Sequence, residues 1–149
     1  MSKSLVREAS IEDTFDILIL AKEFSKEAPK THKWNKDKTE KFIITAIESP
    51  NATVIVFEDD GEIVGAIVGL LNEMYMSQTM VATELAWFVS KDYRGKKGSI
   101  LLVKTFEEWA RKNNADYVCM GDIHGIISLE NLYGRLGYLK CETTYMKEI

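Results

Sequence analysis

Apolar residues in the first third of the chain recur at helical spacing after one short strand. Residues 5–9 are predicted to form the strand, and the spacing that follows predicts helices over about 11–27 and 38–48. Ser10 precedes an acidic first turn and is the expected N-cap of the first helix. Pro50 ends the second helix, because the residue before a proline disfavours the helical conformation.

The period then changes to that of strands. Residues 52–58 are rich in β-branched side chains, and residues 62–71 are apolar again. The Asp60-Gly61 pair between these two runs predicts a β-hairpin. Residues 81–90 are expected to form the next strand.

The second half alternates between helices and strands. Helices are predicted over 99–113 and 128–136, with a short strand over 116–120 and one or two strands from 138 to the end. Gly137 is the expected C-cap of the last helix. The hairpins predict an antiparallel portion, and the strand–helix–strand unit over 81–120 should be parallel and right-handed. The fold class is therefore α/β, a mixed sheet flanked by helices, and 149 residues suit a single domain.

Composition excludes several kinds of function. A net charge of -4 argues against a general nucleic-acid partner. The longest apolar stretch, over 63–71, is too short to cross a membrane, and an N-terminus without an apolar signal region favours a cytoplasmic location. Two cysteines without a CxxC pattern, together with two histidines, argue against a metal site.

The segment after the strand over 81–90 carries the clearest chemistry. It combines four basic residues with two glycines directly before a helix: Lys91, Arg94, Lys96, Lys97, Gly95 and Gly98. A helix start offers unpaired N–H groups and a positive dipole end, and glycines let the backbone approach a ligand closely. The pattern favours a phosphate or pyrophosphate site, although a solvated basic turn has the same composition. Neither GxxxxGK[ST] nor GxGxxG is present.

Two motifs resemble those of the GNAT acetyltransferases. The run YRGKKG is similar to the family's coenzyme A signature Q/R-x-x-G-x-G/A, and NLYGRLGY at 131–138 is similar to its late helix LYxKxGF. Without a gap, Arg94 takes the first place of the signature, Lys97 replaces its first glycine and Ser99 its last small residue. With a one-residue deletion, Gly98 is the final glycine. The resemblance implies a GNAT-like fold, acetyl-coenzyme A (acetyl-CoA) as cosubstrate, and N-acetyl transfer.

The resemblance also implies roles for single residues. Main-chain groups near Phe88 and Val89 would pair with the pantetheine arm. The backbone N–H groups of the basic loop would hold the pyrophosphate: Arg94, Gly95, Lys96, Lys97, Gly98 and Ser99. Tyr133 would protonate the departing thiolate, or would simply pack one helix face into the core.

Two further residues are candidates for the reaction. Glu84 lies on the strand that enters the site, and a half-buried carboxylate there would have a raised pKa, which suits a general base. The alternative is an exposed strand residue, with water relaying the proton. Trp34 lies in a region that borders the acceptor site in the resembled family, and it would either contact substrate or pack its loop onto the domain.

Together with these residues, the resemblance implies direct transfer of the acetyl group to a primary amine, carried by a small molecule or a peptide. A backbone N–H on the strand would stabilise the thioester oxygen. A catalytically silent module that binds CoA or another protein, and an unrelated anion-binding domain, are the competing hypotheses. A homodimer formed through edge strands is compatible with both the acetyltransferase and the silent binding module.

Overall fold

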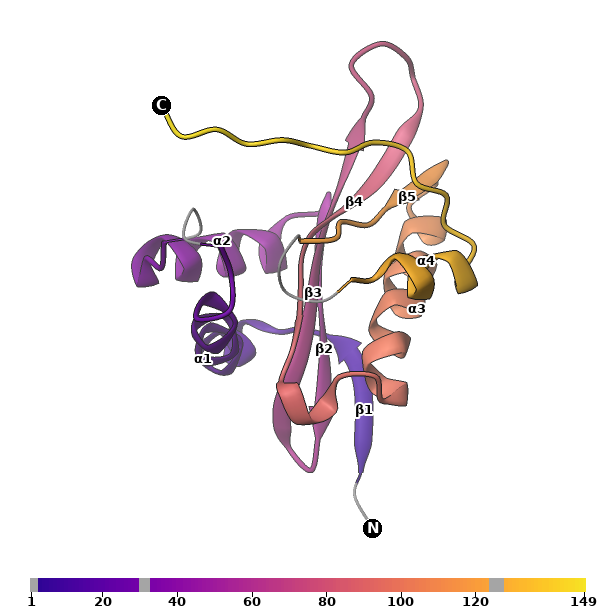
Figure 1. Cartoon of the computed structure of the whole chain (residues 1–149). Helices are drawn as coiled ribbons and strands as arrows, with labels where there is room; N and C mark the ends of the chain where they lie inside the picture. The colour runs from indigo at the N-terminus through magenta and orange to yellow at the C-terminus, as the bar shows by residue number, and fades with distance from the viewer. Residues whose placement is uncertain (1–2, 30–32, 124–127) are drawn as a thin grey trace.

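The computed structural model describes residues 3–29, 33–123 and 128–149, and its centre is one five-stranded sheet (Figure 1). The strand order follows the chain: β1 (Ser4–Glu8), β2 (Ala52–Asp59), β3 (Glu62–Glu73), β4 (Met80–Val89) and β5 (Tyr117–Cys119). The first four strands are antiparallel neighbours, and β5 runs parallel to β4. The predicted mixed sheet is therefore confirmed.

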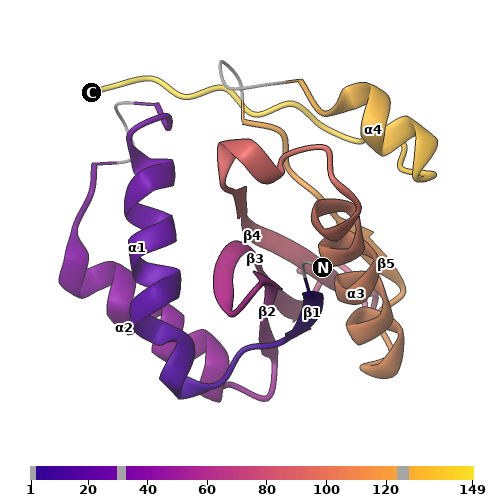
Figure 2. The ribbon, with the colours of Figure 1, turned by 90° about the horizontal axis from the view of Figure 1, so that it is seen from below.

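Helices cover both faces of the sheet (Figure 2). On one face lie α1 (Thr14–Ser25), which follows a 3-10 turn η1 (Ile11–Asp13), and α2 (Lys36–Glu48). On the other side lie α3 (Lys97–Lys112) and the short α4 (Glu130–Arg135). The helix bounds agree with the sequence prediction to within two residues, except that the first helix is predicted from residue 11, where the 3-10 turn η1 precedes α1.

The alternation of strand side chains explains why β2 is apolar throughout. Val54 and Val56 pack against α1 and α2, whereas Ile55 and Phe57 pack against α3. A strand that is buried on both faces has no solvent side, so it needs no polar positions. Phe106 of α3 is fully buried between α3 and the sheet, in the same cluster as Ile55 and Phe57. Burial of a side chain of this size contributes roughly 1.5–3 kcal/mol.

Local chemistry sets the predicted element boundaries. The Ser10 N–H donates to the Asp13 carboxylate at 2.7 Å, and the Asn35 side chain accepts from the Lys38 N–H at 2.9 Å. Both contacts satisfy donors near the start of a helix. Asp60 and Gly61 adopt φ angles of 48° and 85° between β2 and β3, as the predicted hairpin turn requires.

Strands β4 and β5 are paired over a short stretch only. Their register covers Val81 to Thr83 of β4, so from Glu84 onward no described strand neighbours β4 on that side. On its other edge β4 follows β3, with a shift that leaves Leu85 without a partner. Such a bulge bends the strand, and the sheet opens at Glu84.

The predicted final strands are wrong. The chain leaves α4 through Gly137, whose φ is 91°, and residues 138–149 then form no strand. They run as an extended segment across the molecule toward the α1 and α2 side (Figures 1 and 2). A strand requires a hydrogen-bonding partner, and within the described residues no backbone group of 139–149 has one.

Candidate active site

The two predicted catalytic residues meet at one glycine. Glu84 Oε2 accepts a hydrogen bond from the Gly121 N–H at 2.9 Å, and the Tyr133 hydroxyl donates to the Gly121 carbonyl. Glu84 comes from β4 at the point where the sheet opens, Gly121 follows β5, and Tyr133 lies on α4. The fold thus brings a carboxylate and a phenol to the same short piece of main chain.

The environment of Glu84 changes its acidity. The side chain is half-buried, and burial raises its pKa from the ordinary 4.5 to about 7, although the Gly121 N–H opposes this shift. A carboxyl group removed from water favours its neutral form. Near neutral pH, Glu84 therefore exists as a mixture of acid and carboxylate.

Tyr133 is held by its ring and by its hydroxyl. Its ring centroid lies 6.4 Å from that of Trp87 and 5.6 Å from that of Tyr138, and the residue is buried. Burial, reinforced by the nearby Glu84 charge, raises the pKa of Tyr133 above its ordinary value of 10. The phenol consequently keeps its proton at physiological pH and stays a donor.

The basic loop presents a set of free donors. A 3-10 turn η2 (Lys91–Tyr93) is followed by Gly95, whose φ of 75° lies in the left-handed region, and α3 starts at Lys97. Among the residues that the structure describes, the N–H groups of Gly95, Lys97 and Gly98 have no acceptor. This cluster at a helix start, with two exposed lysine side chains beside it, suits an anion.

The other three predicted loop donors are already used. The N–H groups of Arg94, Lys96 and Ser99 bond to carbonyl oxygens within the loop, at 3.4, 3.3 and 3.1 Å. The loop is therefore braced by half of its donors, and the remaining half are available to a ligand.

Arg94 points its guanidinium toward protein groups. Its Nε donates to the Val89 carbonyl at 2.9 Å, and both Nη atoms pair with the Glu27 carboxylate. Lys91 Nζ lies 3.4 Å from the same carboxylate. Glu27 carries no signal in the sequence, because no motif surrounds it and its partners are more than sixty residues away in the chain.

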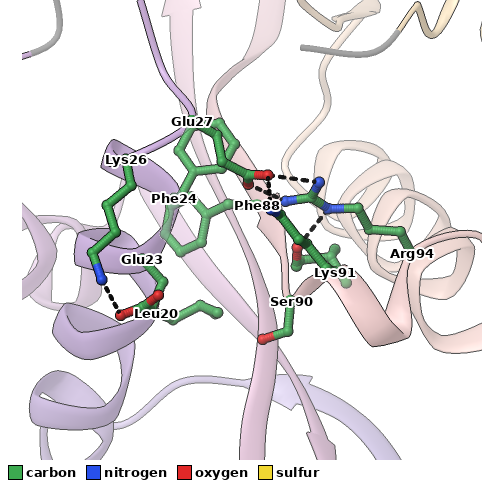
Figure 3. A pocket seen from close by; sticks show the side chains of 10 residues that line it. Leu20, Glu23, Phe24, Lys26, Glu27, Phe88, Ser90, Lys91 and Arg94 are labelled. Carbon is green, nitrogen blue, oxygen red and sulfur yellow. Dashed lines mark hydrogen bonds and ion pairs between the residues drawn. The ribbon is translucent and has the colours of Figure 1, made fainter.

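A cavity of about 280 Å³ lies between the end of α1 and the end of β4 (Figure 3). Phe24 and Phe88 form its aromatic wall, with ring centroids 5.6 Å apart. The lining combines apolar side chains with the ion-paired groups just described: Leu20, Glu23, Phe24, Lys26, Glu27, Phe88, Val89, Ser90, Lys91 and Arg94. Phe88 and Val89, expected to contact the cofactor, both belong to it.

Trp34 lies elsewhere. It is half-buried against the core layer that α1 and α2 form with the sheet, and it does not line this cavity. Within the described ranges, no cluster of His, Cys, Asp and Glu could hold a metal ion. Cys119 and Cys141 are free thiols. Across the same ranges, no helix is long and apolar enough to cross a membrane.

Comparisons with known proteins identify the family of the chain and its fold. The profile described as "Acetyltransferase (GNAT) family" matches residues 12–138. No curated protein matches the chain. An acetyltransferase of Trypanosoma brucei is similar in structure, with a TM-score of 0.76 at 16% identity over 99% of this chain and 100% of that one.

Two further solved structures share the fold. The aminoglycoside N-acetyltransferase AAC(6')-Iy, in complex with CoA, has a TM-score of 0.84 at 12% identity, over 100% of this chain and 96% of that one. A ribosomal-protein-alanine N-acetyltransferase from Brucella melitensis biovar Abortus 2308 has a TM-score of 0.76 at 12% identity, over 98% and 99%. Similarity at these identities demonstrates a common architecture.

Proposed function

Since this chain belongs to the GNAT family of acetyltransferases, whose members depend on acetyl-CoA, we propose that it transfers the acetyl group to a primary amine by direct attack. The observation that carries the proposal is the main chain of Gly121, on which Glu84 and Tyr133 converge. One group is suited to take a proton and the other to give one, and an acyl transfer to an amine requires both steps.

Glu84 is proposed as the general base. An ammonium group is not nucleophilic, so the attacking amine must lose a proton. A base whose pKa lies near the working pH accepts that proton most efficiently, and the pKa of Glu84 is about 7. The hydrogen bond from the Gly121 N–H holds the carboxylate in one orientation while it acts.

Tyr133 is proposed as the donor to the leaving group. Its hydroxyl remains protonated because burial raises its pKa, and its contacts with Trp87 and Tyr138 fix the ring. The hydroxyl would exchange its bond to the Gly121 carbonyl for one to the departing sulfur. Water can then hydrogen-bond to the Gly121 carbonyl, because Gly121 is exposed.

The residues of the site fit acetyl-CoA, which supplies an acetyl group already activated as a thioester. The free N–H groups of Gly95, Lys97 and Gly98 would hold the pyrophosphate, with Lys96 and Lys97 adding positive charge. The edge of β4 beyond Glu84, including Phe88 and Val89, has no described strand beside it and would pair with the pantetheine amides.

The acceptor is proposed to be a small molecule or a peptide that carries a primary amine, with Trp34 as a candidate contact. The names of the similar structures include both kinds of acceptor, an aminoglycoside and the alanine of a ribosomal protein.

The direct test measures release of the CoA thiol from acetyl-CoA across a panel of aminoglycosides, polyamines and peptides. We expect turnover with at least one amine class, and loss of that turnover in a Glu84→Gln/Tyr133→Phe double variant. Binding of acetyl-CoA without turnover on any amine would instead support a silent CoA-binding module.

We also propose that the protein forms a homodimer through its C-terminal segment. Residues 139–149 are extended and exposed, and the outer edge of β5 has no partner among the described strands. Leu139, Tyr145 and Met146 are 92%, 91% and 73% exposed, so this one segment presents several large side chains to solvent, as a surface for a partner would. Pairing of this segment with β5 of a second copy would cover the open edge of β5 and the exposed side chains of the segment.

A further inference from the structure

Glu27 joins the end of α1 to the basic loop. It lies two residues beyond the last residue of the helix, where its N–H still donates to the Phe24 carbonyl at 3.0 Å. Its carboxylate pairs with both Nη atoms of Arg94 and lies 3.4 Å from Lys91 Nζ (Figure 3). A two-pronged contact between guanidinium and carboxylate fixes orientation as well as position.

Arg94 in turn connects the two halves of the loop. Its backbone immediately precedes Gly95, where the chain turns toward the free N–H groups of α3. Its Nε donates to the carbonyl of Val89, the last residue of β4, at 2.9 Å. Glu27, Arg94 and Val89 thus form a continuous chain of polar contacts from α1 to the end of β4.

This arrangement assigns Arg94 a different task from the lysines. Arg94 lowers the pKa of Glu27, so the carboxylate is ionised at neutral pH and neutralises much of the guanidinium charge. Phosphate groups are therefore attracted mainly by the free N–H groups and by Lys96 and Lys97. A long arginine side chain without its carboxylate partner would lose this fixed orientation.

We propose that Glu27 is a positioning residue for acetyl-CoA, which holds Arg94 against Val89 and so keeps the end of β4 and the start of α3 correctly spaced. The inference rests on the proposed function, because it assumes that this loop and strand bind the cofactor. It predicts an effect on cofactor binding that is transmitted through Arg94, with little effect on the chemical step.

The experiment compares Glu27→Gln, Arg94→Gln and the double variant with the wild type. Calorimetry gives the dissociation constant for CoA, and steady-state kinetics with the best amine give KM and kcat. We expect Glu27→Gln to weaken CoA binding about 5- to 20-fold and to raise KM for acetyl-CoA in parallel, while kcat changes less than about threefold. The double variant should bind no more weakly than Arg94→Gln alone, because both changes break the same chain of contacts.

Asp16→Asn is the matched control. Asp16 is an exposed carboxylate on α1 that does not line the cavity. Its substitution removes one negative charge from the neighbouring helix without touching Arg94, so CoA binding should stay unchanged. Glu27→Asp keeps the carboxylate and should restore binding to within about threefold of the wild type, which also guards against misfolding of the Gln variant.

Three results would overturn the proposal. Unchanged or tighter CoA binding by Glu27→Gln would mean that Glu27 only subtracts charge from the loop. Additive losses in the double variant would mean that it does not act through Arg94, and equal losses in kcat and binding would indicate general destabilisation. If the wild type itself fails to bind CoA, the proposed function fails as well, so the two failures are distinguishable.

Discussion

At the residue scale, the raised pKa of Glu84 leads to a defined pH dependence. Only the carboxylate form accepts a proton, so kcat/KM should rise about tenfold per pH unit below pH 7 and level off above it. Glu84→Gln keeps an acceptor for the Gly121 N–H but cannot act as a base. We expect this variant to lower kcat/KM at pH 8 by about 100-fold and to abolish the rise of kcat/KM with pH below pH 7. The pH profile is measured with an acceptor whose amine does not titrate in this range, or is corrected for the titration of the acceptor amine.

The same residue affects stability with the opposite trend. Because the folded pKa of about 7 lies above the unfolded value of 4.5, the contribution of Glu84 to stability is fully present below pH 4.5 and is lost as pH rises through 7. Relative to the wild type, Glu84→Gln should therefore gain about 2 kcal/mol of unfolding free energy between pH 5 and pH 8. A stability difference that is independent of pH would contradict the assigned pKa.

Tyr133 can be tested without disturbing its packing. Tyr133→Phe keeps the ring against Trp87 and Tyr138 but removes the hydroxyl that now donates to Gly121. We expect kcat to fall about 10- to 100-fold with KM for acetyl-CoA nearly unchanged. An acetyl donor with a more acidic thiol should recover part of the loss, and an equal loss with both donors would argue for a structural role only.

At the scale of elements, the two loop glycines are needed for different reasons. A Cβ at Gly98 would lie 2.3 Å from the Phe57 ring, whereas a Cβ at Gly95 would meet no atom within 4 Å but would sit at a φ of 75°. Phe57 cannot move away easily, because it is buried and packs edge-on against Tyr93.

Alanine substitutions should separate these effects. Gly98→Ala should cost about 1–3 kcal/mol by pushing α3 off β2, and Gly95→Ala about 1–2 kcal/mol through backbone strain. Both should weaken CoA binding, because both displace the free N–H groups. Gly134→Ala, which has open space and an ordinary φ in α4, should leave CoA binding unchanged and raise stability slightly. Thermal unfolding with and without CoA measures all three, and a normal CoA response in Gly98→Ala would contradict the proposed site.

How far each element could be predicted depends on how local its determinants are. The β2 strand and the Asp60-Gly61 turn are determined by residues within their own segments, and both are present as predicted. Glu84 and Tyr133 were accessible as candidates through strand position and motif. Gly121 and Glu27 were not, because their importance arises from contacts 37 and 67 residues apart in the chain. The last strands failed for the related reason that a strand exists only with a partner.

At the scale of the whole molecule, the C-terminal segment carries a strand pattern without a strand. From Leu139 to Tyr145 the odd-numbered positions are Leu, Cys, Thr and Tyr, whereas Lys140 and Glu142 are charged. This alternation is typical of a strand with one buried face. The segment nevertheless crosses the molecule in an extended form with its side chains exposed (Figure 1). The pattern is satisfied only if another strand, with an apolar surface behind it, receives the segment.

The open edge of β5 in a second copy meets this requirement, and a symmetric exchange would satisfy both edges at once. We therefore expect a dimer at micromolar concentration by light scattering after size exclusion, and a monomer when residues 139–149 are deleted. Leu139→Lys/Tyr145→Lys should shift the equilibrium in the same direction while keeping the backbone, and Lys140→Gln/Glu142→Gln on the opposite face should not. A wild type that stays monomeric up to about 100 μM, or a deletion variant that still dimerises, would exclude the exchanged strand. The consequence reaches the active site, because β5 leads directly into Gly121 and its edge partner would then help to place the residue on which Glu84 and Tyr133 meet.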